Sequence, residues 1–219
     1  MIFEDLVTTT KAMQDLQRKT AIKNNKDLQE ITDTKYRVLL TQVNLFVVTI
    51  EYLYSDVNVH KNDEILTSMS ELLGALEKVV ETGFASRDEV TNAENSFKTI
   101  QGNMRKEWSK QYADITGSTV STLEAIRGID PENVGSCLQK IQPAESWELD
   151  VKKYKTMSSG LVDADELIVS LGLDDEIITF LQNTNSGKAT LRDLNDKVLS
   201  WIREENLEGK IRISFVKNR

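Results

Sequence analysis

Backbone-breaking residues are scarce in this chain of 219 residues, which contains only 2 Pro and 10 Gly. Neither type occurs before Gly74, and the first proline is Pro131. A fold rich in β-strands needs turn residues roughly every ten positions, so long stretches without them disfavour sheets. The scarcity predicts long helices and an all-α fold class.

Cysteine and histidine occur once each, as Cys137 and His60. A single cysteine excludes an internal disulfide and cysteine-rich metal knuckles, and it suits a reducing compartment. A single histidine excludes helical di-iron sites and zinc-protease motifs, which need more than one. We expect Cys137 to be a buried thiol on an apolar helix face rather than a nucleophile. The sequence therefore predicts no catalytic residue, no metal site and no cofactor, and hence no enzyme.

An excess of basic residues is also missing, because 35 acids outnumber 27 Lys and Arg and give a net charge of −8. Acids outnumber bases in both halves of the chain, so an acidic average does not hide a basic half. Proteins that hold DNA or RNA by its phosphates usually carry a basic stripe. Direct nucleic-acid binding is therefore disfavoured.

Long hydrophobic runs are lacking as well. The most apolar stretch covers residues 38–54 and is interrupted by Gln42, Asn44 and Glu51, whereas a membrane span needs about 18 or more consecutive apolar residues. The first residues include acids and no apolar signal region. We expect this stretch to be a core segment, with no membrane association and a cytoplasmic location.

The apolar residues of positions 1–57 follow helical rather than strand periodicity. Strict alternation fails at Gln42 and Asn44, and the apolar run is too long for one strand. The predicted heptad row comprises Tyr36, Leu40, Val43, Val47, Ile50, Tyr54 and Val57, broadened by Leu39, Phe46 and Leu53. A thinner row upstream comprises Leu6, Met13 and Leu16. One or two long helices are expected, with a kink or break at Asn24 and Asn25.

Capping residues divide the rest of the first predicted domain. Residues 55–60 are expected to form a turn, and Asn62 to cap a second helix over residues 63–82 that stops at Gly83. Ser86 and Glu89 match a capping box that starts a third helix, which is expected to end before Gly117. The pattern predicts an elongated antiparallel helical bundle or coiled coil over residues 1–117.

Shorter elements predict a compact helical domain over residues 118–219. The expected helix starts are Ser121 with Glu124, Asp130 with Pro131, Asp174, Thr190 and Asn195. A longer amphipathic helix is expected from about Trp147 to Gly172, and residues 183–187 are expected to form a loop. Residues 211–215 alternate apolar with polar side chains and form the one predicted strand.

Two charged clusters in this second domain are candidate docking sites. The acids are Asp163, Asp165, Glu166, Asp174, Asp175 and Glu176. A solvated helix face with acids at a helix N-terminus explains them best; the alternatives are a docking surface for a basic partner and a cation site. The C-terminal tail carries Lys210, Arg212, Lys217 and Arg219 without an acid, which favours an inert tail, with protein or phosphate contact as alternatives.

The candidate partner-binding residues are Asp174, Asp175, Glu176, Lys210, Arg212 and Phe215. Phe215 is included because a lone strand at residues 211–215 needs a partner's sheet edge to satisfy its backbone. Together these features predict a non-catalytic helical adaptor or regulatory subunit that binds other proteins, with a second copy of the chain as one candidate partner. The alternatives are an accessory subunit of a bacterial defence or genome-maintenance complex that contains an ATPase or nuclease, and a His-free enzyme using carboxylates on helices. No small-molecule substrate is indicated.

Overall fold

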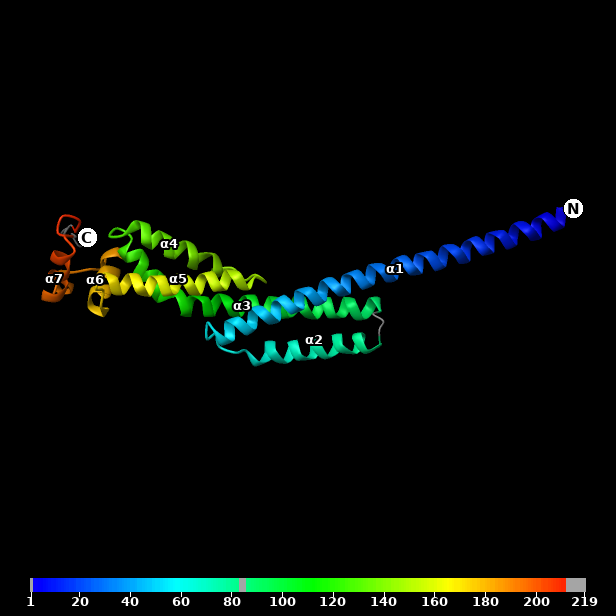
Figure 1. Cartoon of the computed structure of the whole chain (residues 1–219), viewed down its shortest axis with the longest axis horizontal. Helices are drawn as coiled ribbons and strands as arrows, with labels where there is room; N and C mark the ends of the chain where they lie inside the picture. The colour runs from blue at the N-terminus through cyan, green and yellow to red at the C-terminus, as the bar shows by residue number, and fades with distance from the viewer. Residues whose placement is uncertain (1, 83–85, 212–219) are drawn as a thin grey trace, which may run out of the picture. The chain divides into compact units, whose positions relative to one another are not determined.

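Helices dominate the computed structural model of the chain, which describes residues 2–82 and 86–211 (Figure 1). The structure is 81% helical, which confirms the predicted all-α class. No strand is present in the described ranges. Of the predicted strand, only Ile211 is described, and residues 212–215 lie outside the described residues together with Gly83.

The chain divides into two compact units, residues 1–106 (unit 1) and residues 107–219 (unit 2). Helix α3 (Arg87–Ile126) contributes to both units, so the predicted boundary at residue 117 falls inside a helix. The predictions that α3 ends before Gly117 and that Ser121 starts a new helix are wrong. A glycine inside a helix costs only about 1 kcal/mol, and the burial of Thr116, Leu123 and Ile126 offsets this cost.

Unit 1 begins with one uninterrupted helix, α1 (Ile2–Ser55), so the predicted kink or break at Asn24 and Asn25 is wrong. A helix of this length is about 80 Å long. Figure 1 shows its C-terminal half beside α2 (Asp63–Thr82) and α3, and its N-terminal half extending past both of them. The first buried side chain described on α1 is that of Thr32.

The core-facing row of α1 consists of buried side chains spaced alternately four and three residues apart: Leu39, Val43, Phe46, Ile50 and Leu53. The predicted row included Val47, but the Val47 side chain is 37% exposed. Ile50, three residues later and also predicted, is only 6% exposed, so the buried face is rotated away from Val47. Phe46 meets Phe97 of α3 edge to face, with ring centroids 5.6 Å apart. The Tyr36 hydroxyl donates to the Leu76 carbonyl of α2 (2.9 Å). These contacts join α1, α2 and the first part of α3 around one core.

The helix starts of unit 1 were predicted correctly. The Asn62 side-chain oxygen accepts hydrogen bonds from the backbone N–H groups of Glu64 (3.1 Å) and Ile65 (3.2 Å). At the start of α3, the Glu89 N–H donates to Ser86 Oγ (3.2 Å) and the Ser86 N–H donates to Glu89 Oε2 (2.9 Å). Each cap satisfies N–H groups that a helix end leaves without a partner.

Unit 2 adds four α-helices to the end of α3 within the described residues: α4 (Pro131–Ile141), α5 (Val151–Ser170), α6 (Asp175–Asn185) and α7 (Asp196–Glu204). Short 3-10 turns, η1 (Gln142–Glu145) and η2 (Leu191–Asp193), follow α4 and α6. Asp130 caps α4 as predicted, whereas Trp147 lies before α5 rather than on it, because Asp150 is the N-cap. The predicted loop at residues 183–187 is shorter, since α6 continues to Asn185.

An aromatic cluster forms the core of unit 2. Trp108 of α3 donates its indole N–H to the Ala144 carbonyl (2.7 Å) and meets Tyr154 of α5 edge to face at 5.0 Å. Trp147 packs on both rings. Burial raises the pKa of the Tyr154 hydroxyl well above its usual range. These contacts join α3, η1 and α5 around one buried core.

Candidate protein-binding surfaces

The predicted acidic residues at the start of α6 are engaged within unit 2. Asp174 is the N-cap of α6, and its Oδ1 accepts from the N–H groups of Glu176 (3.0 Å) and Ile177 (3.1 Å). The other Asp174 oxygen forms an ion pair with Lys197 of α7. Glu176 accepts a hydrogen bond from the Asn195 side chain at the start of α7 (2.8 Å). Asp174 and Glu176 thus connect α6 to α7, and Asp175 beside them is exposed.

The electrostatics of this junction follow from the same bonds. The hydrogen bond from Lys197 is the largest cause that lowers the pKa of Asp174, followed by the backbone bond from Ile177. The Asp174 carboxylate in turn raises the pKa of Lys197. Both groups are therefore charged at neutral pH and stabilise the α6–α7 contact.

The other predicted charged residues do not form one site. Asp163 pairs with Lys140 of α4, which joins α4 and α5. Lys210 is exposed, while Arg212 and Phe215 lie outside the described residues. Within the described part of the chain, no group of three His, Cys, Asp or Glu side chains is arranged to hold a metal ion.

A groove of about 720 Å³ lies between α2 and α3 in unit 1. Buried apolar side chains such as Leu72 and Val79 lie at its floor, and Ser68, Ala75 and Ser96 are among the small residues that line it. Glu89 also lines it, but its carboxylate caps α3, and the Ser86 hydrogen bonds lower its pKa. The groove thus offers apolar contact area. The Glu89 carboxylate at its edge is already used to cap α3.

A second row of side chains on α1 lies outside the core-facing row, although Ile31 at its middle also lines a small hollow with Arg87 and Val90 of α3. We call it the outer row. It comprises Leu16, Thr20, Asp27, Ile31, Thr34, Val38, Thr41, Leu45 and Val48. All nine side chains are exposed, and Ile31, Val38, Leu45 and Val48 are 41 to 55% exposed. Apart from the seven-residue step between Thr20 and Asp27, the positions repeat every three or four residues. They therefore fall on one face of a helix, about a third of a turn from the core-facing row.

The threonines of the outer row form hydrogen bonds within the helix, as helical threonines elsewhere in the chain do, for example Thr91 and Thr156. The hydroxyls of Thr20 and Thr34 each donate to the backbone carbonyl four residues earlier (both 2.8 Å), and that of Thr41 does the same at 3.0 Å. These bonds satisfy the hydroxyls inside the helix and leave the methyl groups facing outward. A partner could therefore cover the row without leaving these hydroxyl groups buried and without a hydrogen bond, which would cost free energy.

The chain matches no protein-family model, no curated protein and no solved structure. The case for a binding surface therefore rests on the geometry of α1 itself. From Ile31 to Val48 the exposed apolar side chains recur at a helical spacing, whereas Ile22 and Leu28 are exposed singly elsewhere on α1. Exposed apolar residues on a protein surface are normally scattered singly, as these two are.

One window of α1 is also long and apolar enough to cross a membrane, with a mean hydropathy of 1.3. A third of that window (33%) is buried inside the structure. The buried residues include Phe46 and Leu53, which are fully buried in the core of unit 1. Length and hydropathy are shared by membrane spans and by core helices, so they do not distinguish the two.

Sequence reasoning missed the outer row because it sought one apolar face per helix. Val47 was assigned to the core-facing row, while Val38 and Val48 counted only as apolar content. The signal was present in the sequence as a second series with the same spacing, Ile31, Val38 and Leu45, each seven residues apart.

Proposed function

We propose that this protein is a non-catalytic helical adaptor that binds another protein through the outer row of α1. The observation that supports the proposal is the series of exposed apolar side chains Ile31, Val38, Leu45 and Val48 on one face of α1. A helix that presents such a series accepts a second helix, whose side chains fit between its own. We further propose that α1, α2 and α3 form an antiparallel coiled-coil bundle in unit 1, which holds residues 34–48 of the row rigid.

The expected affinity follows from the size of the row. Covering the exposed half of an aliphatic side chain contributes roughly 1 kcal/mol, and part of this gain offsets the loss of freedom on association. A partner must therefore contact most of the row, including Ile31, Val38 and Leu45, to bind stably. The single buried Cys137 suits the reducing cytoplasm that we propose as the site of action.

Site-specific photo-crosslinking in the host cell tests the proposal. A photoreactive phenylalanine analogue is placed at Val38 or Leu45 of the outer row, and at Asn44 as an exposed control position off the row. The expected result is a discrete protein adduct from Val38 and Leu45 and none from Asn44. Equal labelling from all three positions would mean that the row is not a specific surface.

A second measurement addresses a membrane as the occupant. The purified chain is floated with neutral and anionic phospholipid vesicles, beside the double variant Val38→Glu with Leu45→Glu. We expect no co-flotation of either chain. Flotation of the wild-type chain that the double variant loses would assign the row to a lipid surface and overturn the proposal.

A further inference from the structure

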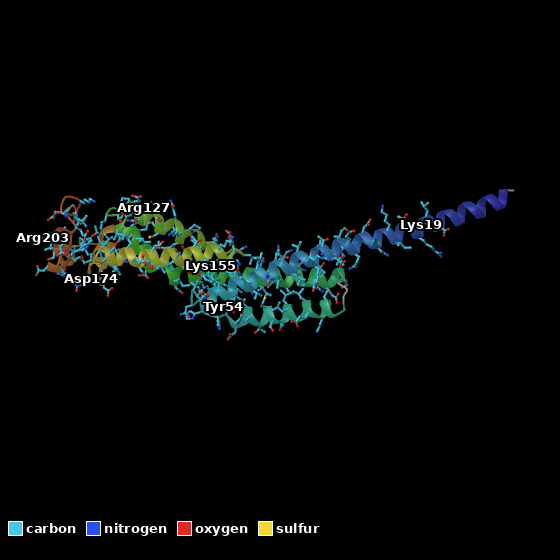
Figure 2. The ribbon with its side chains drawn as sticks, in the orientation of Figure 1. Lys19, Tyr54, Arg127, Lys155, Asp174 and Arg203 are labelled. Carbon is cyan, nitrogen blue, oxygen red and sulfur yellow. The ribbon has the colours of Figure 1, made fainter. Side chains whose placement is uncertain are left out.

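Basic and acidic residues are separated into adjacent blocks along α1, and the acidic block lies beside the start of α3. The basic block, residues 18–26, contains Arg18, Lys19, Lys23 and Lys26 and no acid. The acidic block, residues 27–33, contains Asp27, Glu30 and Asp33 and no base. All seven side chains are exposed, and Figure 2 shows Lys19 on the extending part of the helix. Within α1 these charges can pair only with residues three or four positions away, as Lys23 can with Asp27 and Lys26 with Glu30. Such exposed pairs contribute only about 0.2–0.5 kcal/mol each, so the blocks can still favour an oppositely charged partner.

We infer that the occupant of the outer row is a second copy of this chain, whose α1 runs antiparallel to the first across a twofold axis between residues 25 and 26. The inference rests on the proposed function, because it names the partner of the same row. The axis places the basic block of each copy against the acidic block of the other. A twofold contact of this kind forms twice and closes on itself, which is the commonest arrangement of homodimers.

The outer row is complementary to itself under this axis. Thr20 lies opposite Ile31 of the second copy, and Leu16 lies close to Thr34. Counting further back in the sequence, the positions of Met13 and Leu6 match those of Val38 and Leu45. The extending half of one α1 thus covers the outer row on the packed half of the other, which explains why this row is exposed in a single copy.

A parallel pairing of the same helices is disfavoured by charge. It would align Lys23 with Lys23 and Asp27 with Asp27 of the second copy, along with every other member of both blocks. Like charges across a helical interface oppose association, whereas opposite charges fix both register and orientation. The blocks therefore select the antiparallel dimer.

The experiment uses the purified full chain and two single-cysteine additions, Thr20→Cys and Ile31→Cys. Light scattering after size exclusion measures the mass, with circular dichroism as a check that each variant folds like the wild type. Mild oxidation then tests proximity, because a disulfide needs its Cα atoms within roughly 7 Å. Cys137 is buried and common to all chains, so it serves as an internal background.

The expected results are a wild-type mass of twice the chain and a covalent dimer only when the Thr20→Cys and Ile31→Cys chains are mixed. The double variant Val38→Glu with Leu45→Glu should lose the dimer, while the matched control Asn44→Glu should keep it. Cross-linking of the Thr20→Cys chain alone would show a parallel pairing and overturn the inference. A wild-type chain that stays monomeric at every concentration would overturn it as well.

The failure of this inference is distinguishable from the failure of the proposed function. A monomeric chain that still gives a discrete heavier adduct from Val38 in the host cell would retain the adaptor and replace its partner by a different protein. A monomeric chain that gives no such adduct would overturn both the dimer and the adaptor function.

Discussion

Asp174 shows how a charged residue that looks available in the sequence becomes part of the structure. Its carboxylate caps α6 through two backbone N–H groups and pairs with Lys197 of α7. One side chain therefore satisfies a helix end and joins two helices. These two structural roles account for an acid at position 174 without a second protein. A role for Asp174 in binding another protein remains a prediction.

We expect Asp174→Asn and Asp174→Ala to separate these two tasks. Asparagine is about as good a cap as aspartate, so the Asn variant loses mainly the ion pair, whereas the Ala variant loses both. Thermal melting at neutral pH should rank the chains as wild type, then Asn, then Ala. Equal melting of the Asn and Ala variants would contradict the capping role.

The pH dependence of the same variants has a defined sign. Because Lys197 lowers the pKa of folded Asp174, its stabilisation is complete above the ordinary carboxyl pKa of about 4 and is lost as pH falls through the lower folded value. The melting difference between wild type and Asp174→Asn should therefore shrink below about pH 4. A difference that stays constant down to the acid limit would show that the charge plays no part.

Gly160 of α5 is the closest approach between α4 and α5. A Cβ atom added there would lie 2.7 Å from Lys140 Cβ and 3.3 Å from the Cys137 carbonyl oxygen. We expect Gly160→Ala to lower the free energy of unfolding by about 1–3 kcal/mol, because the two helices must separate. Gly135→Ala in α4 is the control: its Cβ meets nothing within 4 Å, so it should stabilise by up to about 1 kcal/mol. Denaturant titration of both variants measures the difference.

Helix α1 carries two rows of side chains on different faces. The core-facing row contacts α2 and α3, and we propose that the outer row contacts another molecule. Steps of three and four residues occur in both rows, and Val47 belongs to neither row. The apolar residues in the sequence therefore do not show which of them face the core of unit 1. Only burial separates Ile50, at 6% exposure, from Val47, at 37%.

Two aspartate substitutions three residues apart test this separation. Ile50→Asp places an unpaired charge in the core and should reduce the free energy of unfolding by roughly 3–5 kcal/mol. Val47→Asp adds the same charge at a half-exposed site and should cost about 1 kcal/mol or less. Chemical denaturation gives both values. Similar losses in the two variants would mean that the core-facing row is broader than the structure has it.

Four helix starts of this chain were predictable from sequence, whereas helix continuity was not. Asn62, Ser86, Asp130 and Asn195 act through bonds to the nearest turn, so local sequence contains the whole interaction. Gly117 and the pair Asn24 and Asn25 carry helix penalties of only about 1 kcal/mol or less per residue, and packing or the length of the helix on either side overrides them.

The candidate site was less predictable than the fold. Identifying Asp174 as a docking residue requires knowing whether Lys197 reaches it, which is a contact between two helices. The outer row requires knowing which faces of α1 are covered by α2 and α3. Both facts depend on tertiary packing, which a residue pattern along one element does not contain.

The unequal covering of α1 has a consequence for amide hydrogen exchange. Its backbone ladder is continuous, but among the side chains described on α1 the first buried one is that of Thr32. Amides of residues 39–53 should exchange slowly at any protein concentration, because their opening requires disrupting unit 1. Amides of residues 16–31 should exchange quickly in dilute solution and become protected as the concentration rises, since a second α1 would then cover them. Mass spectrometry over a dilution series would then show the boundary between protected and unprotected amides moving along α1. A boundary that stays near Thr32 at every concentration would show that no second α1 binds.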